Sequence, residues 1–223
     1  MNMKNRTRFC SIILIILQFF NLISCIKKDS RVNQNLVDIE GNSYKTITIG
    51  TQVWMAENLK TTKFNDGSEI PEYYYHNDSS SYSEIYGVLY SLNSVKESKL
   101  CPTGWHVPTA TDWELLSEYL GGDSIAGSKL KEEGLAHWSL PNSDATNESG
   151  FTALPGGYRF LSPYHSMCCG TRYIPTFSSL GNIGIWWGDT IHCALYNSVA
   201  TLELSTDPIP SGMCFSVRCV KDK

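Results

Sequence analysis

The segment CPTGWHVPTATDWELLSEYLGG, residues 101–122, carries the clearest helical signal in the chain, and the rest of the fold can be worked out from it. Thr109 suits the N-cap position, and Asp112 follows three residues later, which is close to a capping box. Gly121 and Gly122 end the pattern, as glycine commonly does after a helix. We therefore predict a helix over 109–120 with one apolar face. That face consists of residues spaced at i, i+3 and i+7, namely Trp113, Leu116 and Leu120.

On both sides of this helix the sequence predicts short strands. Residues 37–39 and 44–49 alternate apolar and polar side chains around Glu40-Gly41-Asn42, and Gly-Asn at such a turn indicates a hairpin. A second, shorter helix is expected at about 126–132. A hairpin, one or two helices, then irregular antiparallel sheets in a loop-rich second half describe an α+β fold. Further strands or apolar pieces are expected at 53–55, 86–92, 151–154, 185–187, 194–196, 200–204 and 215–220.

The N-terminus has the features of a lipoprotein signal peptide. Lys4, Arg6 and Arg8 precede an apolar run, Cys10 to Phe20, that is too short for a comfortable membrane span but fits the h-region of a signal. The run leads to Leu22-Ile23-Ser24-Cys25, which resembles a bacterial lipobox. An ordinary secretory signal with a chance cysteine is the alternative, but position, small residue and cysteine all favour the lipobox. We expect a signal at 1–24, lipidation of Cys25 with acyl chains such as palmitate, a polar tether over 25–36, and a domain at 37–223.

Charge and the residues after Cys25 indicate where the protein works. The net charge of −4 becomes −7 once residues 1–24 are removed, and no basic block appears, so a nucleic-acid partner is not expected. Ile26-Lys27-Lys28-Asp29 loosely resembles the Lys-acidic export signal of surface lipoproteins in Bacteroidota. We therefore expect attachment to the outer membrane through the N-terminal lipid, with the domain at the cell surface.

The cysteine count favours an oxidising compartment. Of eight cysteines, Cys10 leaves with the signal and Cys25 takes lipid, which leaves six. An even number in an exported chain predicts three disulfide bridges. The six are Cys101, Cys168, Cys169, Cys193, Cys214 and Cys219.

Four motifs resemble the Fibrobacter succinogenes major paralogous domain, abbreviated FISUMP. They are VDIEGNSY (37–44) with IGTQVWMAENL (49–59), CPTGWHVP (101–108) with Asp112-Trp113, NESGFTALPGGYR (147–159), and FSVRCVK (215–221). They run in order over roughly residues 37–222. The resemblance implies a domain of exported Bacteroidota-type proteins with no settled biochemical activity. The family in turn looks distantly like C-type-lectin-like folds, which is a fold analogy and gives no function by itself.

The resemblance also implies a disulfide pairing. Cys101 and Cys219 lie in two of the family motifs and are therefore paired with each other. Adjacent cysteines rarely bridge, so one of Cys168 and Cys169 is expected to pair with Cys193 and the other with Cys214. A zinc site is the alternative, because thiolate and imidazole are preferred zinc ligands, but exported thiols usually oxidise first. Its ligands would come from His165, Cys168, Cys169, His192 and Cys193.

Two groups of residues are candidates for ligand binding. Tyr73, Tyr74 and Tyr75 form an aromatic row in a polar stretch, where tyrosine either packs or stacks on sugars and protein side chains. Where many family members have Trp-Trp-Ser-Ser-Thr, this chain has Trp186-Trp187-Gly188-Asp189-Thr190, so Trp186 and Asp189 are further candidates. A calcium site built on Leu140-Pro141-Asn142 and Trp187-Gly188-Asp189, with Asp144, Asn147 and Glu148 nearby, is disfavoured because calcium needs six to eight oxygen ligands.

No catalytic signature is apparent. The chain has no Gly-x-Ser-x-Gly, no His-Glu-x-x-His and no phosphate-binding loop, and no metal or cofactor is expected. A cysteine-based activity, as in formylglycine-generating enzymes, would need a free reactive thiol. The sequence therefore favours a non-catalytic domain that binds glycan or protein ligands. A structural component of an envelope or surface assembly is the second hypothesis, and an exported enzyme is the third.

Overall fold

Helix α4 (Ala110–Leu120) confirms the element predicted from residues 101–122. In this computed structural model, which describes residues 32–166 and 170–223, the Thr109 hydroxyl accepts a hydrogen bond from the Asp112 amide. The Asp112 carboxylate accepts one from the Thr109 amide in return, completing the capping box. Gly121 ends the helix in a left-handed conformation, with φ of 104°. The predicted apolar face is buried.

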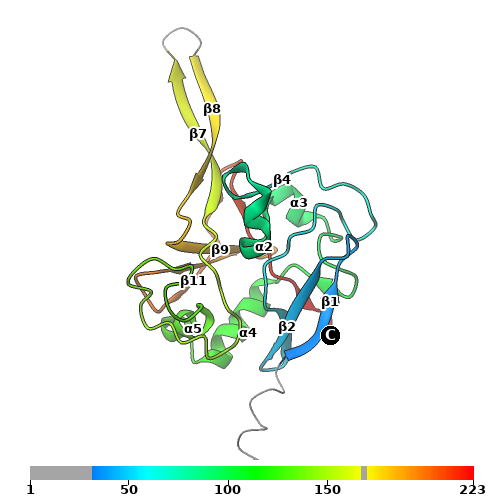
Figure 1. The fold of residues 1–223 in the computed structure, drawn as a ribbon, viewed down its shortest axis with the longest axis vertical. Helices are drawn as coiled ribbons and strands as arrows, with labels where there is room; N and C mark the ends of the chain where they lie inside the picture. The colour runs from blue at the N-terminus through cyan, green and yellow to red at the C-terminus, as the bar shows by residue number, and fades with distance from the viewer. Residues whose placement is uncertain (1–31, 167–169) are drawn as a thin grey trace, which may run out of the picture. The chain divides into compact units, whose positions relative to one another are not determined.

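The first sheet joins the two ends of the domain. Its order is β1 (Val32–Val37), β2 (Ser43–Ile49), β3 (Gln52–Met55), β13 (Val220–Lys221) and β6 (Trp105–His106), so the last strand lies between the N-terminal hairpin and the segment that enters α4 (Figure 1). The disulfide Cys101–Cys219 lies beside this junction, with Cα atoms 6.0 Å apart, and both half-cystines are buried. The pairing implied by the family motifs is therefore confirmed.

Two further antiparallel sheets form the second half. One has the order β11 (Leu202–Ser205), β10 (His192–Tyr196), β9 (Ile183–Trp187). The other has the order β4 (Tyr73–Tyr74), β5 (Leu89–Ser91), β12 (Cys214–Phe215), β7 (Tyr158–Ser166), β8 (Gly170–Ser178). The remaining helices are α2 (Ser83–Tyr86), α3 (Leu92–Lys96) and α5 (Asp123–Leu130), with 3₁₀ turns at His76–Asp78 and Ser80–Tyr82. The α+β class is thus confirmed.

The core is built around tryptophan side chains. Trp54, Trp113 and Trp186 lie in one buried cluster with Phe151, while Trp187 and Phe215 lie in the other. A polar network runs through this interior: Asn58 Oδ1 accepts from Trp186 Nε1 at 2.8 Å and from Arg218 Nε at 2.7 Å. Arg218 also donates to the carbonyls of Phe151 and Thr152. These hydrogen bonds of the Arg218 guanidinium connect the 147–159 motif to the C-terminal motif.

Several predicted elements differ from the structure. A strand was expected at 37–39, but β1 covers Val32–Val37 and so reaches into the segment expected to be a tether. The second helix begins three residues earlier than expected, at Asp123. Residues 151–154 form no strand: Ala153 makes only an isolated parallel bridge to Lys131, and its carbonyl also accepts a hydrogen bond from Trp138 Nε1. Residues 215–220 are two short pieces in different sheets rather than one strand. Between those pieces, the Ser216 amide donates to Ile185 and the Val217 carbonyl accepts from Leu59, so the chain passes from one sheet to the other.

The longest pair of strands was not predicted at all. β7 and β8 pair over nine residues each, and their outer part projects beyond the neighbouring elements in Figure 1. Their outer residues are exposed, including Tyr164 and Tyr173. Pro163 and Pro175 lie within these strands, and proline argues against a strand when only the sequence is read.

Within the described residues, no helix has the length and apolar character needed to cross a membrane. The signal peptide, the lipidated Cys25, and Cys168 and Cys169 lie outside the described residues, so those predictions stay predictions.

Candidate functional site

Cys193 and Cys214 are unbridged in the structure. Their expected partners, Cys168 and Cys169, lie outside the described residues, so the two expected bridges stay predictions. Cys193 pairs with Trp186 and Leu204 at the centre of its sheet and is completely buried in the core. Cys214 lies in a different sheet, between β5 and β7. Each thiol is therefore surrounded by its own strand neighbours.

The aromatic row is divided between two faces of β4. The rings of Tyr73 and Tyr75 are 5.7 Å apart and edge to face, and both pack against the second core cluster. Tyr74 alternates to the other face, as successive strand residues do. There its ring lies 3.7 Å from the guanidinium carbon of Arg159. Tyr74 therefore lines the cavity described below, whereas Tyr73 and Tyr75 pack against the core.

Trp186 and Asp189 lie in different environments. Trp186 is fully buried and belongs to the core, so its assignment as a ligand-binding residue is wrong. Asp189 is exposed and accepts hydrogen bonds from the amide of Ala110, at the start of α4, and from Thr190. It lines a cavity of about 320 Å³ together with His192, Asp207 and Lys96. The charged side chains of that cavity are exposed, and the buried Nδ1 of His192 has no hydrogen-bond partner within the described residues.

Of the residues in the alternative zinc site, Cys168 and Cys169 lie outside the described residues. Within residues 32–166 and 170–223 no three His, Cys, Asp or Glu side chains are grouped as a metal site would require. Asn142, from the calcium hypothesis, is buried and its amide donates to the carbonyls of Glu132 and Gly134. Asn147 is held by Thr152.

A cavity of about 430 Å³ beside Tyr74 has the chemistry of a binding site. Its volume lies within the range of about 300–1,000 Å³ that is usual for small-molecule sites. The wall is formed by β4, β5, β7 and the chain leading into β12. The polar side chains in it that matter chemically are Glu72, Tyr74, Arg159 and Cys214. We call it the Arg159 pocket.

Arg159 is the unusual residue of this pocket. It is only 5% exposed, and it takes part in no ion pair with any described residue. Its Nη1 donates to the carbonyl of Gly212 at 3.2 Å and approaches the sulfur of Cys214 at 3.9 Å. Its Nε is buried and has no hydrogen-bond partner within the described part of the chain. Buried charges are usually paired, so this guanidinium has capacity left for an anion.

Cys214 contributes a neutral thiol to the pocket. Burial raises the pKa of Cys214 to about 11, although the nearby Arg159 acts in the opposite direction. Burial likewise raises the pKa of Cys193 well above its ordinary value. A thiolate is the nucleophilic form of cysteine. Neither described free cysteine therefore has the depressed pKa that a cysteine nucleophile requires.

Neither Arg159 nor Glu72 was among the residues selected from the sequence. Arg159 ends the third family motif, but a single arginine in a strand gives no signal of its own. Glu72 is an exposed carboxylate on the pocket wall. What defines the site is the pairing of β7 with β12 and of β4 with β5, which brings residues about 85 positions apart into contact.

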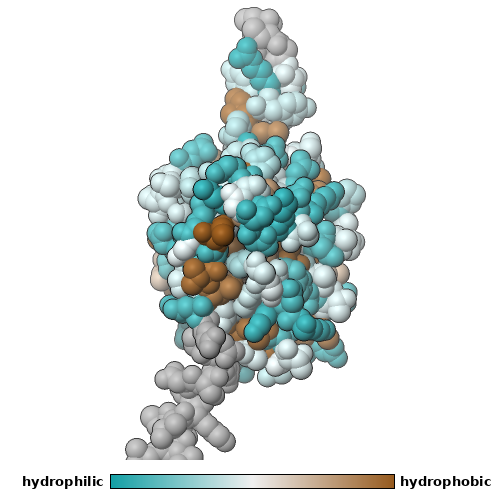
Figure 2. Space-filling view, turned by 90° about the vertical axis from the view of Figure 1, so that its right-hand side faces the viewer, coloured by the Kyte–Doolittle hydropathy of each residue, from teal (hydrophilic) through white to brown (hydrophobic). Residues whose placement is uncertain are grey.

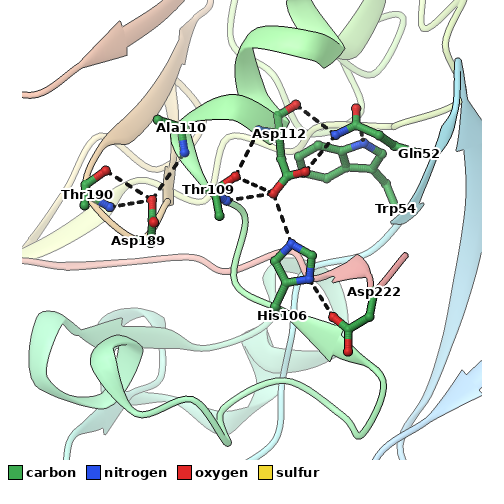
Figure 3. Close-up of polar contacts among 9 residues, drawn as sticks. All are labelled: Gln52, Trp54, His106, Thr109, Ala110, Asp112, Asp189, Thr190 and Asp222. Carbon is green, nitrogen blue, oxygen red and sulfur yellow. Dashed lines mark hydrogen bonds and ion pairs between the residues drawn. The ribbon is translucent and has the colours of Figure 1, made fainter.

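A second polar cluster surrounds His106 at the start of α4 (Figure 3). His106 Nε2 lies 3.0 Å from Asp112 Oδ2, and Nδ1 lies 2.7 Å from Asp222 Oδ1. Gln52 Nε2 donates to Asp112 Oδ1 at 3.1 Å. The imidazole therefore joins the capping carboxylate of α4 to the residue after β13. We interpret this cluster as a structural clamp, because both ring nitrogens are already occupied.

The clamp predicts a pH dependence of stability. Partial burial lowers the pKa of His106, but hydrogen bonds to Asp112 and Asp222 outweigh it, so the net pKa is raised above 6.5. A raised pKa gives stability that is fully present below about pH 6.5 and lost as pH rises through the folded-state value. His106→Gln should therefore lower the free energy of unfolding at pH 6. The loss should stay below about 1 kcal/mol, because the ion pair is partly exposed, and it should be smaller at pH 9 than at pH 6.

Urea unfolding at pH 6 and pH 9 measures this effect. His165→Gln, on the exposed arm of β7, is the control and should leave the pH dependence unchanged. Equal losses for His106→Gln at both pH values would contradict the role assigned to the protonated imidazole.

Together, the fold and the Arg159 pocket define a disulfide-tied α+β domain with a cavity lined by an aromatic ring and a buried cation. The chain belongs to the Fibrobacter succinogenes major domain family, whose model matches residues 47–221. No curated protein and no solved structure matches the chain.

Proposed function

We propose that this protein is a lipid-anchored, non-catalytic binding protein of the outer membrane, with its domain exposed at the cell surface and a glycan as its ligand. The observation that carries the proposal is the Arg159 pocket. It combines an aromatic ring, a cationic hydrogen-bond donor and a carboxylate acceptor in a cavity of suitable size. Sugars present hydroxyl groups and apolar ring faces, and this set of side chains complements both.

The surface and the thiols support the same proposal. The face drawn in Figure 2 is largely hydrophilic, with hydrophobic residues in small groups rather than in one broad patch. A polar ligand suits such a face better than an extensive apolar partner does. The raised pKa values of Cys193 and Cys214 favour a binding role over a cysteine-based activity.

The C-type-lectin-like arrangement is part of the proposal. It is supported by the first sheet, in which β13 from the C-terminus pairs with β3 of the N-terminal hairpin. It is also supported by the loop-rich second half, where the pocket lies.

A glycan array with the mature protein tests the proposed function. We expect wild type to retain a defined set of glycans and Tyr74→Leu to lose at least tenfold in affinity for them. Tyr173→Leu removes a tyrosine that is 66% exposed on the β7–β8 arm and is the matched control. Absence of any glycan binding by the folded wild-type protein, or equal losses in both variants, would overturn the assignment to this pocket.

The lipid anchor is tested separately. Cys25→Ala should abolish incorporation of an alkyne palmitate analogue and release the protein from the membrane fraction, because several acyl chains together give firm attachment. Cys10→Ala, in the expected signal peptide, is the control and should label normally. Unchanged labelling of Cys25→Ala would show that the lipobox assignment is wrong.

A role in envelope or surface assembly is the second candidate. It is favoured by the β7–β8 arm, whose outer strands expose Tyr164, Tyr173 and Ile174. Aromatic residues of this kind are enriched in protein interfaces. Recovery of one envelope protein with the wild type, and its loss with Tyr173→Ser but not with Tyr74→Leu, would favour this candidate.

A further inference from the structure

Arg159 places a fixed positive charge in the pocket without an internal anion to balance it. The carboxylate on the pocket wall, Glu72, is exposed and forms no ion pair with Arg159. Both hydrogen bonds of the guanidinium to described residues use Nη1, so Nε remains without a partner. Leaving a buried donor unsatisfied is costly unless a ligand supplies the acceptor.

We propose that the ligand of the Arg159 pocket is an acidic saccharide, bound through its carboxylate by Arg159. This inference rests on the proposed glycan-binding function and specifies its substrate class. A guanidinium presents N–H groups in a planar fork that matches the two oxygens of a carboxylate. The ring of Tyr74, 3.7 Å from the guanidinium carbon, packs against Arg159 and helps to hold the fork in position.

The other polar groups of the pocket fit an acidic sugar with a single negative charge. Glu72 has no donor capacity when ionised, so it accepts hydrogen bonds from sugar hydroxyls. Its charge also opposes a ligand that carries two or more negative charges at the same place. The thiol of Cys214 is neutral at physiological pH and adds no repulsion. The buried cation Arg159 and the exposed carboxylate of Glu72 together suit a sugar that carries one carboxylate and several hydroxyl groups.

The test compares two probes that differ at a single carboxylate. Galacturonic acid, which carries one negative charge, and its methyl ester are titrated by calorimetry into the full mature protein in detergent micelles. We expect the acid to bind at least tenfold more tightly than the ester, and its affinity to fall as salt increases. Arg159→Met should abolish this preference. Arg172→Met removes an exposed arginine on β8 outside the pocket and should retain it.

A thermal unfolding scan shows whether Arg159→Met is folded. If it is not, a second variant still tests the inference. Glu72→Gln removes an exposed negative charge from the pocket wall and is expected to fold. It should strengthen binding of the acid severalfold relative to binding of the ester. The opposite change, or none, would overturn the inference.

The outcomes separate this inference from the proposed function. Equal binding of acid and ester, with both weakened by Tyr74→Leu, overturns the acidic ligand while the glycan-binding function stands. Retention of the acid preference in folded Arg159→Met overturns the role of Arg159. Failure of both probes together with a blank glycan array overturns both proposals. If only an acidic saccharide of another type, such as sialyllactose tested against lactose, shows the Arg159-dependent preference, the inference is upheld.

Discussion

Arg218→Met is expected to lower the free energy of unfolding by about 2–4 kcal/mol. The guanidinium is fully buried and donates to three acceptors: Asn58 Oδ1 and the carbonyls of Phe151 and Thr152. Methionine fills much of the volume but donates to none of them. A buried acceptor left without a partner costs about 1–3 kcal/mol. Asn58 Oδ1 keeps its hydrogen bond from Trp186 Nε1, so most of the lost stability comes from the unpaired carbonyls of Phe151 and Thr152.

The burial of Arg218 works in the opposite direction and sets the upper limit of this estimate. Desolvation lowers the pKa of Arg218 to about 9, and removing the charge recovers that penalty. Urea unfolding followed by tryptophan fluorescence measures the difference. Arg172→Met, exposed on β8, is the control and should change stability by less than about 0.5 kcal/mol. A loss in Arg218→Met no larger than in this control would show that the arginine does not fasten the two motifs.

The elements that could be predicted are those specified by nearby residues. The helix Ala110–Leu120 has its cap, apolar face and terminal glycine within 13 positions, and all of them behave as the spacing indicates. The first hairpin has its turn residues between its strands. The Cys101–Cys219 bridge spans 118 residues, and it was found only because both cysteines lie in family motifs.

The elements that were missed depend on distant partners. The β7–β8 strands contain proline and polar residues, and their nine register pairs come from pairing with each other rather than from an apolar pattern. In residues 151–154, the carbonyls of the first three accept hydrogen bonds from Arg218 and Trp138, and the backbone pairs only through an isolated bridge at Ala153. Apolar composition indicates burial, whereas hydrogen-bond partners decide whether a buried segment becomes a strand.

Of the residues that line the Arg159 pocket, only Tyr74 was predicted to bind a ligand. The tyrosine row pointed to Tyr74, but the sequence did not distinguish it from Tyr73 and Tyr75, which the strand directs to the core. Arg159 became visible as a site residue only through its burial and its unpartnered Nε. Trp186 and Asp189 are neighbours in sequence but differ in burial, which a family-specific substitution cannot reveal.

Cys219→Ser is expected to lower the free energy of unfolding by about 2–5 kcal/mol, a large share of the stability of a typical domain. Cys219 lies directly before β13, and β13 pairs with both β3 and β6 in the first sheet. A two-residue terminal strand frays readily unless it is tied down. The bridge to Cys101 holds it beside the segment that enters α4. Its loss should therefore make limited proteolysis begin near the C-terminus.

A double-mutant cycle distinguishes loss of the bridge from loss of the buried side chains. Cys101→Ser, Cys219→Ser and the double variant all remove the same bond, so their losses should be similar rather than additive. Wild type treated with a reductant should lose a comparable amount. The free and buried Cys214 offers a matched control, since reduction should leave the difference between Cys214→Ser and wild type unchanged. If the two single losses add in the double variant, the stabilisation comes from packing, and the terminal strand is held by the sheet rather than by the disulfide.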